Sequence, residues 1–355
     1  MQDHGGNRRE ARKAYGLSRV LDFSASINPL GHPEGLREHL NAHWDEVLHY
    51  PEREAPEVAG ALAETYSVPL AAVLVGSGSA EPIDLALRTL APRRVVLCPP
   101  DFGLYDELAP PGVPLVRIPR REDQGFALDL EGLASEVTQG DLVLVSNPGN
   151  PCGLAMGREP MLALLAQCAA VGALLAVDEA FADFCPEHSV LAEAGRHPAL
   201  LVFRSLTKFF GIPGLRLGFV VAPPELRTRL ASRQVPWSVG ALAQEAGLYC
   251  LSKADWAART LDCVGRARTR LAQGLSSLPG LRPLPSNANY LLVEARPPAL
   301  SAAELYDALA RKGLLIRHCG SFGLADRYFR TAVRTQQENQ ALLEALDGLT
   351  PSMES

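Results

Sequence analysis

Short, almost uninterrupted apolar runs alternate with segments of helical character between residues 71 and 224, and this alternation most constrains the fold. The runs are "AAVLVG", "RRVVLCPP", "DLVLVSNP", "ALLAVDEAF", "ALLVFRSLTK" and "LRLGFVVAPP". Strands without polar alternation are typical of a mainly parallel sheet that helices cover on both faces. The sequence therefore predicts an α/β fold, in which ligands bind at the carboxyl ends of the strands.

The pattern changes after about residue 240. A long helical stretch at 241–278 is followed by a strand, a helix, two strands and a last helix at 336–349, which together indicate a smaller α+β domain. A chain of 355 residues is long enough for both units. We expect a large domain at 28–240, a small domain formed by 1–27 and 241–350, and a disordered tail at 351–355.

One apolar segment, "MLALLAQCAAVGALLAV" at 161–177, is long enough to raise the question of a membrane span. Gly172 and the acidic residues that follow divide it more naturally into a buried helix, a turn and a buried strand. The first residues, "MQDHGGNRREARKAYG", contain no apolar stretch of the kind that directs secretion. The cytoplasm is therefore the expected location, with no membrane contact.

Charge, cysteines and histidines exclude several functions. The net charge is −6 and basic residues form no long block, which argues against nucleic acid as a partner. The seven cysteines are widely spaced, odd in number and without a Cys-x-x-Cys pair, as expected for reduced thiols rather than a zinc site. No metal site is expected from the histidines either, because we found no metal-ligand spacing among His39, His43, His49, His188 and His197.

Polar residues directly follow the predicted strands and suggest a phosphate site. Ser79 and Ala80 open a helix after the glycine-rich turn "GSGSAEP", so their backbone amides lie where a helix N-terminus favours an anion. Many helix caps look alike, so this turn alone establishes little. Ser205, Thr207 and Arg216 could add hydroxyl and guanidinium donors to the same phosphate.

A lysine, a carboxylate and an aromatic ring complete the pattern. Lys208, at a strand end in apolar surroundings and near other cations, is expected to have a lowered pKa and to form a Schiff base. Asp178 ends a buried strand and needs a donor partner, which a protonated pyridine nitrogen would be. Phe102 could stack on a ring. These groups describe a site for pyridoxal 5'-phosphate, with Lys208 carrying the cofactor.

The order of motifs resembles the fold type I pyridoxal phosphate enzymes of the class I/II aminotransferase superfamily. The matching stretches are "GSGSAEP", "CPPDFGLY", "SNPGNPCG", "VDEAF", "SLTKFFGIPGLRLG" and "YFRTAVR", which span nearly the whole chain. The resemblance implies a large domain with a mainly parallel seven-stranded sheet and a small domain built from both termini. It also implies a homodimer with active sites at the subunit interface.

The resemblance assigns cofactor contacts residue by residue. Lys208 matches the Schiff-base lysine, Asp178 the partner of the pyridine nitrogen, and Asn150 the donor to the phenolic oxygen. Phe102 matches the stacking aromatic, although Tyr105 is close enough in sequence to be an alternative.

Further matches concern the substrate and the dimer. Tyr50 of "HYPE" resembles the tyrosine that reaches the phosphate across the dimer. Arg330 matches the arginine that binds the substrate carboxylate, with Arg334 as an alternative in the same segment. The candidates for the phosphate of a phosphorylated amino-acid substrate are Arg317, His4 and, more weakly, Asn28.

Within the superfamily the chain is similar to two groups that act on phosphorylated amino compounds, the threonine-phosphate decarboxylases of cobalamin biosynthesis and the histidinol-phosphate aminotransferases. The opening "HGGN" with "LDFSASINPLG", the segment "VDEAFADF" and "QVPWSVGALAQ" favour the decarboxylases. Phe181 agrees, because aminotransferases commonly have a tyrosine three residues after the aspartate. The aminotransferase activity stays open as the alternative. A regulator is disfavoured because regulators of this type usually carry an added DNA-binding domain, for which we expect no room here. An inert scaffold is disfavoured because Lys208, Asp178, Asn150 and Arg216 are all present.

Overall fold

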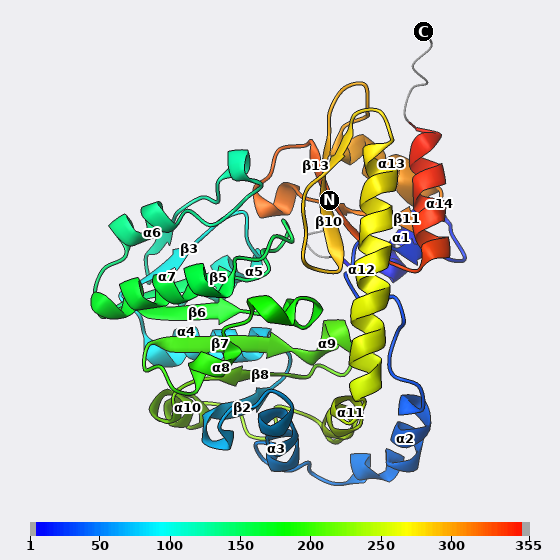
Figure 1. The fold of residues 1–355 in the computed structure, drawn as a ribbon. Helices are drawn as coiled ribbons and strands as arrows, with labels where there is room; N and C mark the ends of the chain where they lie inside the picture. The colour runs from blue at the N-terminus through cyan, green and yellow to red at the C-terminus, as the bar shows by residue number, and fades with distance from the viewer. Residues whose placement is uncertain (1–4, 350–355) are drawn as a thin grey trace.

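The computed structural model describes residues 5–349 and has a seven-stranded sheet at its centre (Figure 1). The strand order is β2-β8-β7-β6-β5-β3-β4. All neighbours are parallel except β8, which runs antiparallel to β2 and β7. The strands are β2 (Val73–Gly76), β3 (Arg94–Leu97), β4 (Leu115–Arg117), β5 (Asp141–Ser146), β6 (Leu174–Asp178), β7 (Leu200–Ser205) and β8 (Gly218–Val221).

This sheet confirms the predicted mainly parallel, seven-stranded architecture. The apolar runs revealed six of its strands. They did not reveal β4, a short edge strand whose residues are only partly covered. Every residue of β5 and β7 is buried, because successive side chains point to opposite faces and helices cover both. Val143 and Val145 accordingly pack in one apolar cluster, and Leu142 and Leu144 in another.

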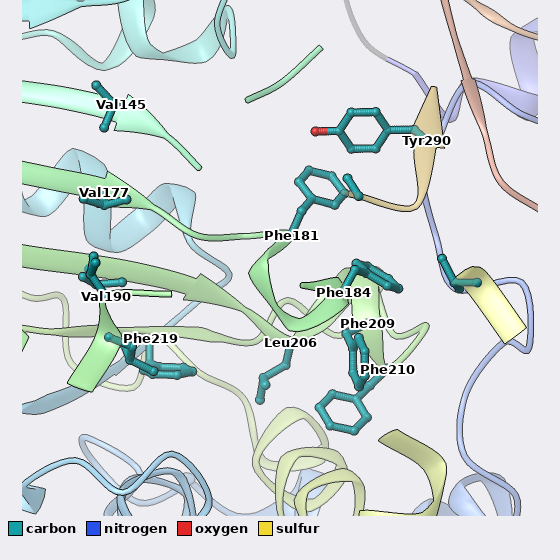
Figure 2. Close-up of a cluster of buried hydrophobic side chains, with 14 of the residues drawn as sticks. Val145, Val177, Phe181, Phe184, Val190, Leu206, Phe209, Phe210, Phe219 and Tyr290 are labelled. Atoms are coloured by element: carbon teal, nitrogen blue, oxygen red, sulfur yellow. The ribbon is translucent and has the colours of Figure 1, made fainter. Parts of the chain in front are cut away.

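The apolar cluster that contains Val143 and Val145 is shown in part in Figure 2, where Val145 and Val177 of the sheet are drawn together with several buried phenylalanines. Burying one such side chain contributes about 1.5–3 kcal/mol. The helices of this part are α3 (Pro56–Thr65), α4 (Ala80–Leu90), α5 (Leu104–Leu108), α6 (Leu130–Glu136), α7 (Arg158–Ala170), α8 (Leu191–Ala194), α9 (Leu206–Phe209) and α10 (Pro224–Ala231).

The apolar segment at 161–177 divides as predicted. Helix α7 ends at Ala170, Gly172 turns the chain at a φ of 75°, and β6 begins at Leu174. Glycine accepts this left-handed conformation without the strain that a side chain would add. Among residues 5–349, no helix has both the length and the hydropathy required to cross a bilayer.

A second group of elements lies beside the large sheet (Figure 1). It contains an antiparallel sheet in the order β12-β13-β10-β9 and a parallel pair of β1 with β11. The strand bounds are β1 (Leu21–Asp22), β9 (Leu281–Pro283), β10 (Tyr290–Ala295), β11 (Leu314–Leu315), β12 (Arg317–His318) and β13 (Tyr328–Ala332). The β1–β11 pair places residues near the start of the chain beside residues near its end.

The remaining helices connect and cover these sheets. They are α1 (Arg8–Tyr15), α2 (Leu36–Ala42), α11 (Ala241–Leu251), α12 (Ala254–Ser276), α13 (Ala302–Arg311) and α14 (Gln336–Asp347). Helix α11 packs against α2 and α3, and the long α12 runs from there to β9 and α14 (Figure 1). Capping boxes at Ser301 and Thr335 satisfy the first amides of α13 and α14.

The domain bounds at 28–240 and 241–350 remain a prediction, and the predicted tail at 351–355 lies outside the described residues. All seven cysteines are free thiols.

Candidate active site

A cavity of about 240 Å³ lies at the carboxyl ends of the central strands and is closed on one side by the small antiparallel sheet. Ser146, Asp178 and Ser205 are the last residues of β5, β6 and β7, and all three line it. Most of the predicted site residues meet here: Ser79, Ala80, Phe102, Asn150, Asp178, Ser205, Thr207, Lys208, Arg216, Arg317 and Arg330.

One end of the cavity has the donors that a phosphate needs. Ser79 is the N-cap of α4, and its side chain makes no capping hydrogen bond, so the first amides of the helix are left for another acceptor. The hydroxyls of Ser205 and Thr207 lie 2.7 Å apart. Gly78 permits the close approach of Arg216, because a Cβ there would lie 2.4 Å from its Nη2 atom. Within residues 5–349 the Arg216 guanidinium donates to the Pro213 carbonyl at 3.3 Å and forms no ion pair with a carboxylate.

Lys208 is held in α9, directly after β7, and is partly buried on the cavity wall. Burial lowers the pKa of its ammonium group from 10.5 to about 8, and Arg216 and Arg330 contribute in the same direction, whereas Asp178 opposes them. With this pKa about a tenth of the amine is neutral at pH 7, far more than for an ordinary lysine. Lys208 thus has the property that a nucleophilic lysine requires.

Asp178 lies at the end of β6 with both carboxylate oxygens engaged. The Tyr105 hydroxyl donates to Oδ2 at 2.6 Å, and the Ala180 amide donates to Oδ1 at 3.0 Å. Burial raises the pKa of this carboxyl group to about 6, although the Tyr105 hydrogen bond works against the rise. Phe102 lines the cavity. Tyr105 packs edge-on against the Phe102 ring, with ring centres 5.6 Å apart, and its hydroxyl orients the Asp178 carboxylate. The geometry thus favours Phe102 as the stacking ring.

The opposite wall carries two buried arginines on adjacent strands. Arg317 of β12 is directly paired with Arg330 of β13 in the antiparallel register. Like charges in such positions repel each other, and burial increases the cost of each. Among residues 5–349 no carboxylate forms an ion pair with Arg330, and its Nε has no hydrogen-bond partner. Arg330 therefore gives this wall a positive charge that favours an anionic ligand.

Arg330 is nevertheless firmly positioned. Its Nη1 donates to Oδ1 of Asn150 at 2.5 Å, and its Nη2 donates to the Ser24 carbonyl at 3.0 Å. The guanidinium carbon lies 4.9 Å from the centre of the Tyr290 ring. Arg334, the alternative in the same segment, forms an ion pair with Glu338 and does not line the cavity.

Phe181 lies on the cavity wall and packs edge-on against Tyr290, with ring centres 4.9 Å apart (Figure 2). The Tyr290 hydroxyl donates to the Gly149 carbonyl at 2.7 Å. Phe181 offers no hydroxyl at the position where the aminotransferase pattern has one. Because Phe181 lines the cavity, the replacement of this tyrosine by phenylalanine changes the candidate active site directly.

Two of the predicted residues, Asn28 and Tyr50, do not line this cavity. Asn28 is buried elsewhere, where its amide donates to the Phe209 carbonyl at 2.6 Å and to Thr260 at 2.9 Å. These bonds give it a structural role, so the structure does not support a substrate contact. Tyr50 is 84% exposed and packs against Trp237. His4 lies outside the described residues.

The sequence analysis missed several wall residues. Gly5, Ser24, Ala25 and Ser26 line the cavity, and among residues 5–349 the buried Ser26 hydroxyl has no hydrogen-bond partner. Three of them belong to "LDFSASINPLG", which we had used only for its family resemblance. A run of small residues in an N-terminal segment does not by itself predict which part of the large sheet the segment will contact.

A partly buried lysine, a carboxylate, a stacking ring and a phosphate cradle at these strand ends define a pyridoxal phosphate enzyme of the aminotransferase fold. The family model "Aminotransferase class I and II" matches residues 18–346, and the chain belongs to this family. Its members are enzymes that depend on pyridoxal phosphate. The predicted fold, enzyme class and cofactor are therefore confirmed.

Comparison with individual proteins is consistent with this family. The threonine-phosphate decarboxylase of Salmonella typhimurium is 37% identical over 352 residues, which cover 97% of this chain and 95% of that protein. A histidinol-phosphate aminotransferase of Nitratidesulfovibrio vulgaris is 32% identical over 351 residues, covering 96% and 92%. The crystal structure of L-threonine-O-3-phosphate decarboxylase from Porphyromonas gingivalis aligns with a TM-score of 0.81 at 27% identity, covering 92% and 98%.

Proposed function

We propose that the protein decarboxylates L-threonine O-3-phosphate to (R)-1-amino-2-propanol O-2-phosphate and carbon dioxide, a step of cobalamin biosynthesis. The observation that carries the proposal is the pairing of two buried arginines on the cavity wall, Arg317 and Arg330, which together suit a ligand with two anionic groups. Threonine phosphate has a carboxylate and a phosphate. The similarity to the Salmonella decarboxylase and the presence of Phe181 favour this substrate within the family.

The cavity residues fit the cofactor. The first amides of α4, the hydroxyls of Ser205 and Thr207, and Arg216 would hold its phosphate. Asn150 would donate to its phenolic oxygen, because Arg330 occupies Oδ1 and leaves the Nδ2 group available.

Pyridoxal phosphate, when bound, withdraws electrons from the Cα bond that stands perpendicular to its ring. The task of the protein is to select that bond. Arg330 would hold the substrate carboxylate in one orientation, while Arg317 would fix the phosphate at the other end of the substrate. Asp178 would keep a proton on the pyridine nitrogen. Lys208 would supply a proton to Cα after carbon dioxide leaves.

Aminotransfer from histidinol phosphate is the second candidate. The similarity to histidinol-phosphate aminotransferases at 32% identity supports it, and the phosphate cradle and Lys208 would serve either reaction. The two reactions differ in their requirements, because aminotransfer needs an oxo acid to regenerate the cofactor and decarboxylation does not.

We expect the cofactor-loaded protein to release carbon dioxide from L-threonine O-3-phosphate over many turnovers in the absence of any oxo acid. Carbon dioxide release and the cofactor absorbance would be followed together. Histidinol phosphate with 2-oxoglutarate is the parallel assay and should give little glutamate. Glutamate formation without carbon dioxide release in the first assay would show that the aminotransferase alternative is right.

We also propose that the protein is a cytoplasmic homodimer in which Tyr50 contributes to the partner's cavity. Tyr50 does not line its own cavity, and its 84% exposure leaves it free to reach another subunit. Large apolar side chains exposed near it, Trp44, Leu48 and Trp237, are typical of an interface. Light scattering should give twice the mass of one chain, and a monomeric mass together with full activity would contradict the proposal.

A further inference from the structure

His39, His43 and Glu245 form a cluster outside the cavity, where α2 packs against α11. One ligand atom of each residue lies within 4.8 Å of the others. The sequence analysis saw no metal spacing among the histidines. The interval from 39 to 43 is nevertheless the helical interval that places two side chains on one face. The third group comes from a helix far along the chain, which no local pattern could indicate.

Hydrogen bonding fixes which nitrogen of His43 faces the cluster. Its Nδ1 lies 2.8 Å from the backbone carbonyl of His39, which can only accept, so Nδ1 carries the proton. In the neutral ring the lone pair is then on Nε2, which lies 3.7 Å from Oε2 of Glu245. A lone pair thus faces a carboxylate oxygen, and a cation between them would remove the repulsion.

His39 completes the set from the same helix face. Its Nε2 lies 3.0 Å from the same Glu245 oxygen, and the Tyr249 ring packs 4.8 Å from its ring centre and restricts its orientation. His43 is the C-cap of α2, where the partial negative charge of the helix end favours a cation. The three side chains are 23%, 39% and 24% exposed, so an ion could enter from solvent.

The spacing suits a small divalent ion. Ligand atoms about 2.0–2.2 Å from a tetrahedral zinc ion are about 3.3–3.6 Å from one another. The two nitrogen-to-oxygen distances of 3.0 and 3.7 Å bracket these values. Two imidazoles and one carboxylate are also a ligand set that zinc accepts, with the remaining position open to water.

We propose that His39, His43 and Glu245 bind one borderline divalent transition-metal ion, such as Zn²⁺, through the two Nε2 atoms and the carboxylate. The ion links α2 to α11. His43 also directly precedes the 3₁₀ helix η1 (Trp44–Leu48), so the ion fixes the start of the segment that leads to Tyr50. The site is separate from the catalytic cavity, and the proposal does not depend on which reaction the enzyme catalyses.

The test is a calorimetric titration of the cofactor-loaded enzyme with Zn²⁺ after treatment with a chelator. We expect one strong site per chain. His43→Ala and Glu245→Gln should each weaken it by at least about 10–100-fold, since even the loss of an outer partner has this effect. His49→Ala is the matched control, because His49 is an exposed histidine of the same segment. It should leave the affinity unchanged.

Two further measurements exclude a folding artefact. Circular dichroism should give the same spectrum for all variants without metal, and Zn²⁺ should raise the melting temperature of the parent and His49→Ala proteins by a few degrees, but not that of the others. With Cu²⁺ as the probe, electron paramagnetic resonance should show two imidazole nitrogens in the parent and one in His43→Ala. A lack of stoichiometric binding, or equal binding by the cluster variants and the control, would overturn the proposal.

Discussion

Replacing Lys208 by alanine is expected to abolish carbon dioxide release from threonine phosphate, with a loss on the order of 10⁴-fold or more. The chain has four lysines, at positions 13, 208, 253 and 312, and Lys208 is the one that lines the cavity. Its lowered pKa provides a neutral amine that can bond to the cofactor aldehyde. Alanine has no group that can form this bond or carry a proton to Cα.

The same substitution should not destabilise the fold. Burial lowers the pKa of Lys208 to about 8, so below that pH the folded chain holds an ammonium group in surroundings that disfavour it. Removing it relieves this cost, at the expense of a small cavity. Thermal melting of the variant without cofactor should therefore occur at or near the temperature of the parent, which separates loss of chemistry from loss of structure.

Covalent attachment provides the direct readout. Borohydride reduction followed by denaturation and mass spectrometry should retain the cofactor on the parent protein, on the peptide that contains Lys208. Lys208→Ala should retain none. Lys312→Ala is the matched control, because Lys312 is exposed and donates to the Ala345 carbonyl, away from the cavity. Attachment at another lysine, or undiminished turnover in Lys208→Ala, would contradict the assignment.

The positions of the main cavity residues could be predicted because one geometric rule governs them. The carboxyl ends of parallel strands meet at one edge of the sheet, so residues that follow separate apolar runs, such as Asp178 and Ser205, had to lie close together. Lys208 follows by a few residues and is held by the short helix α9. Local sequence and sheet topology suffice for these residues.

Contacts that depend on register or on the path of loops could not be predicted in the same way. The pairing of Arg317 with Arg330 follows from the alignment of β12 and β13, and the bond from Tyr105 to Asp178 follows from how α5 packs. Asn28 was placed near the substrate from its segment, yet the chain turns its amide toward α12. The cluster of His39, His43 and Glu245 could not be predicted either, because it forms only where α2 packs against α11.

The substitution Arg330→Lys should lower kcat/KM for threonine phosphate by about 10²–10⁴-fold. It removes a forked pair of charge-assisted hydrogen bonds, each worth about 1.5–3 kcal/mol, and keeps the charge. A lysine also cannot reproduce the two bonds that hold Arg330 against Asn150 and Ser24. Arg334→Lys is the matched control, because Arg334 is paired with Glu338 away from the cavity and should have little effect.

Inhibition by the product distinguishes the two anion sites that Arg330 and Arg317 are proposed to form. (R)-1-Amino-2-propanol O-2-phosphate has the phosphate but no carboxylate. Its inhibition constant should therefore change little in Arg330→Lys and rise at least about tenfold in Arg317→Gln, which removes one or more charge-assisted bonds to phosphate. The reverse pattern would exchange the two roles. Equal effects of both substitutions on product binding would mean that the two arginines bind a single anion together, and the substrate would then need only one anionic group at this wall.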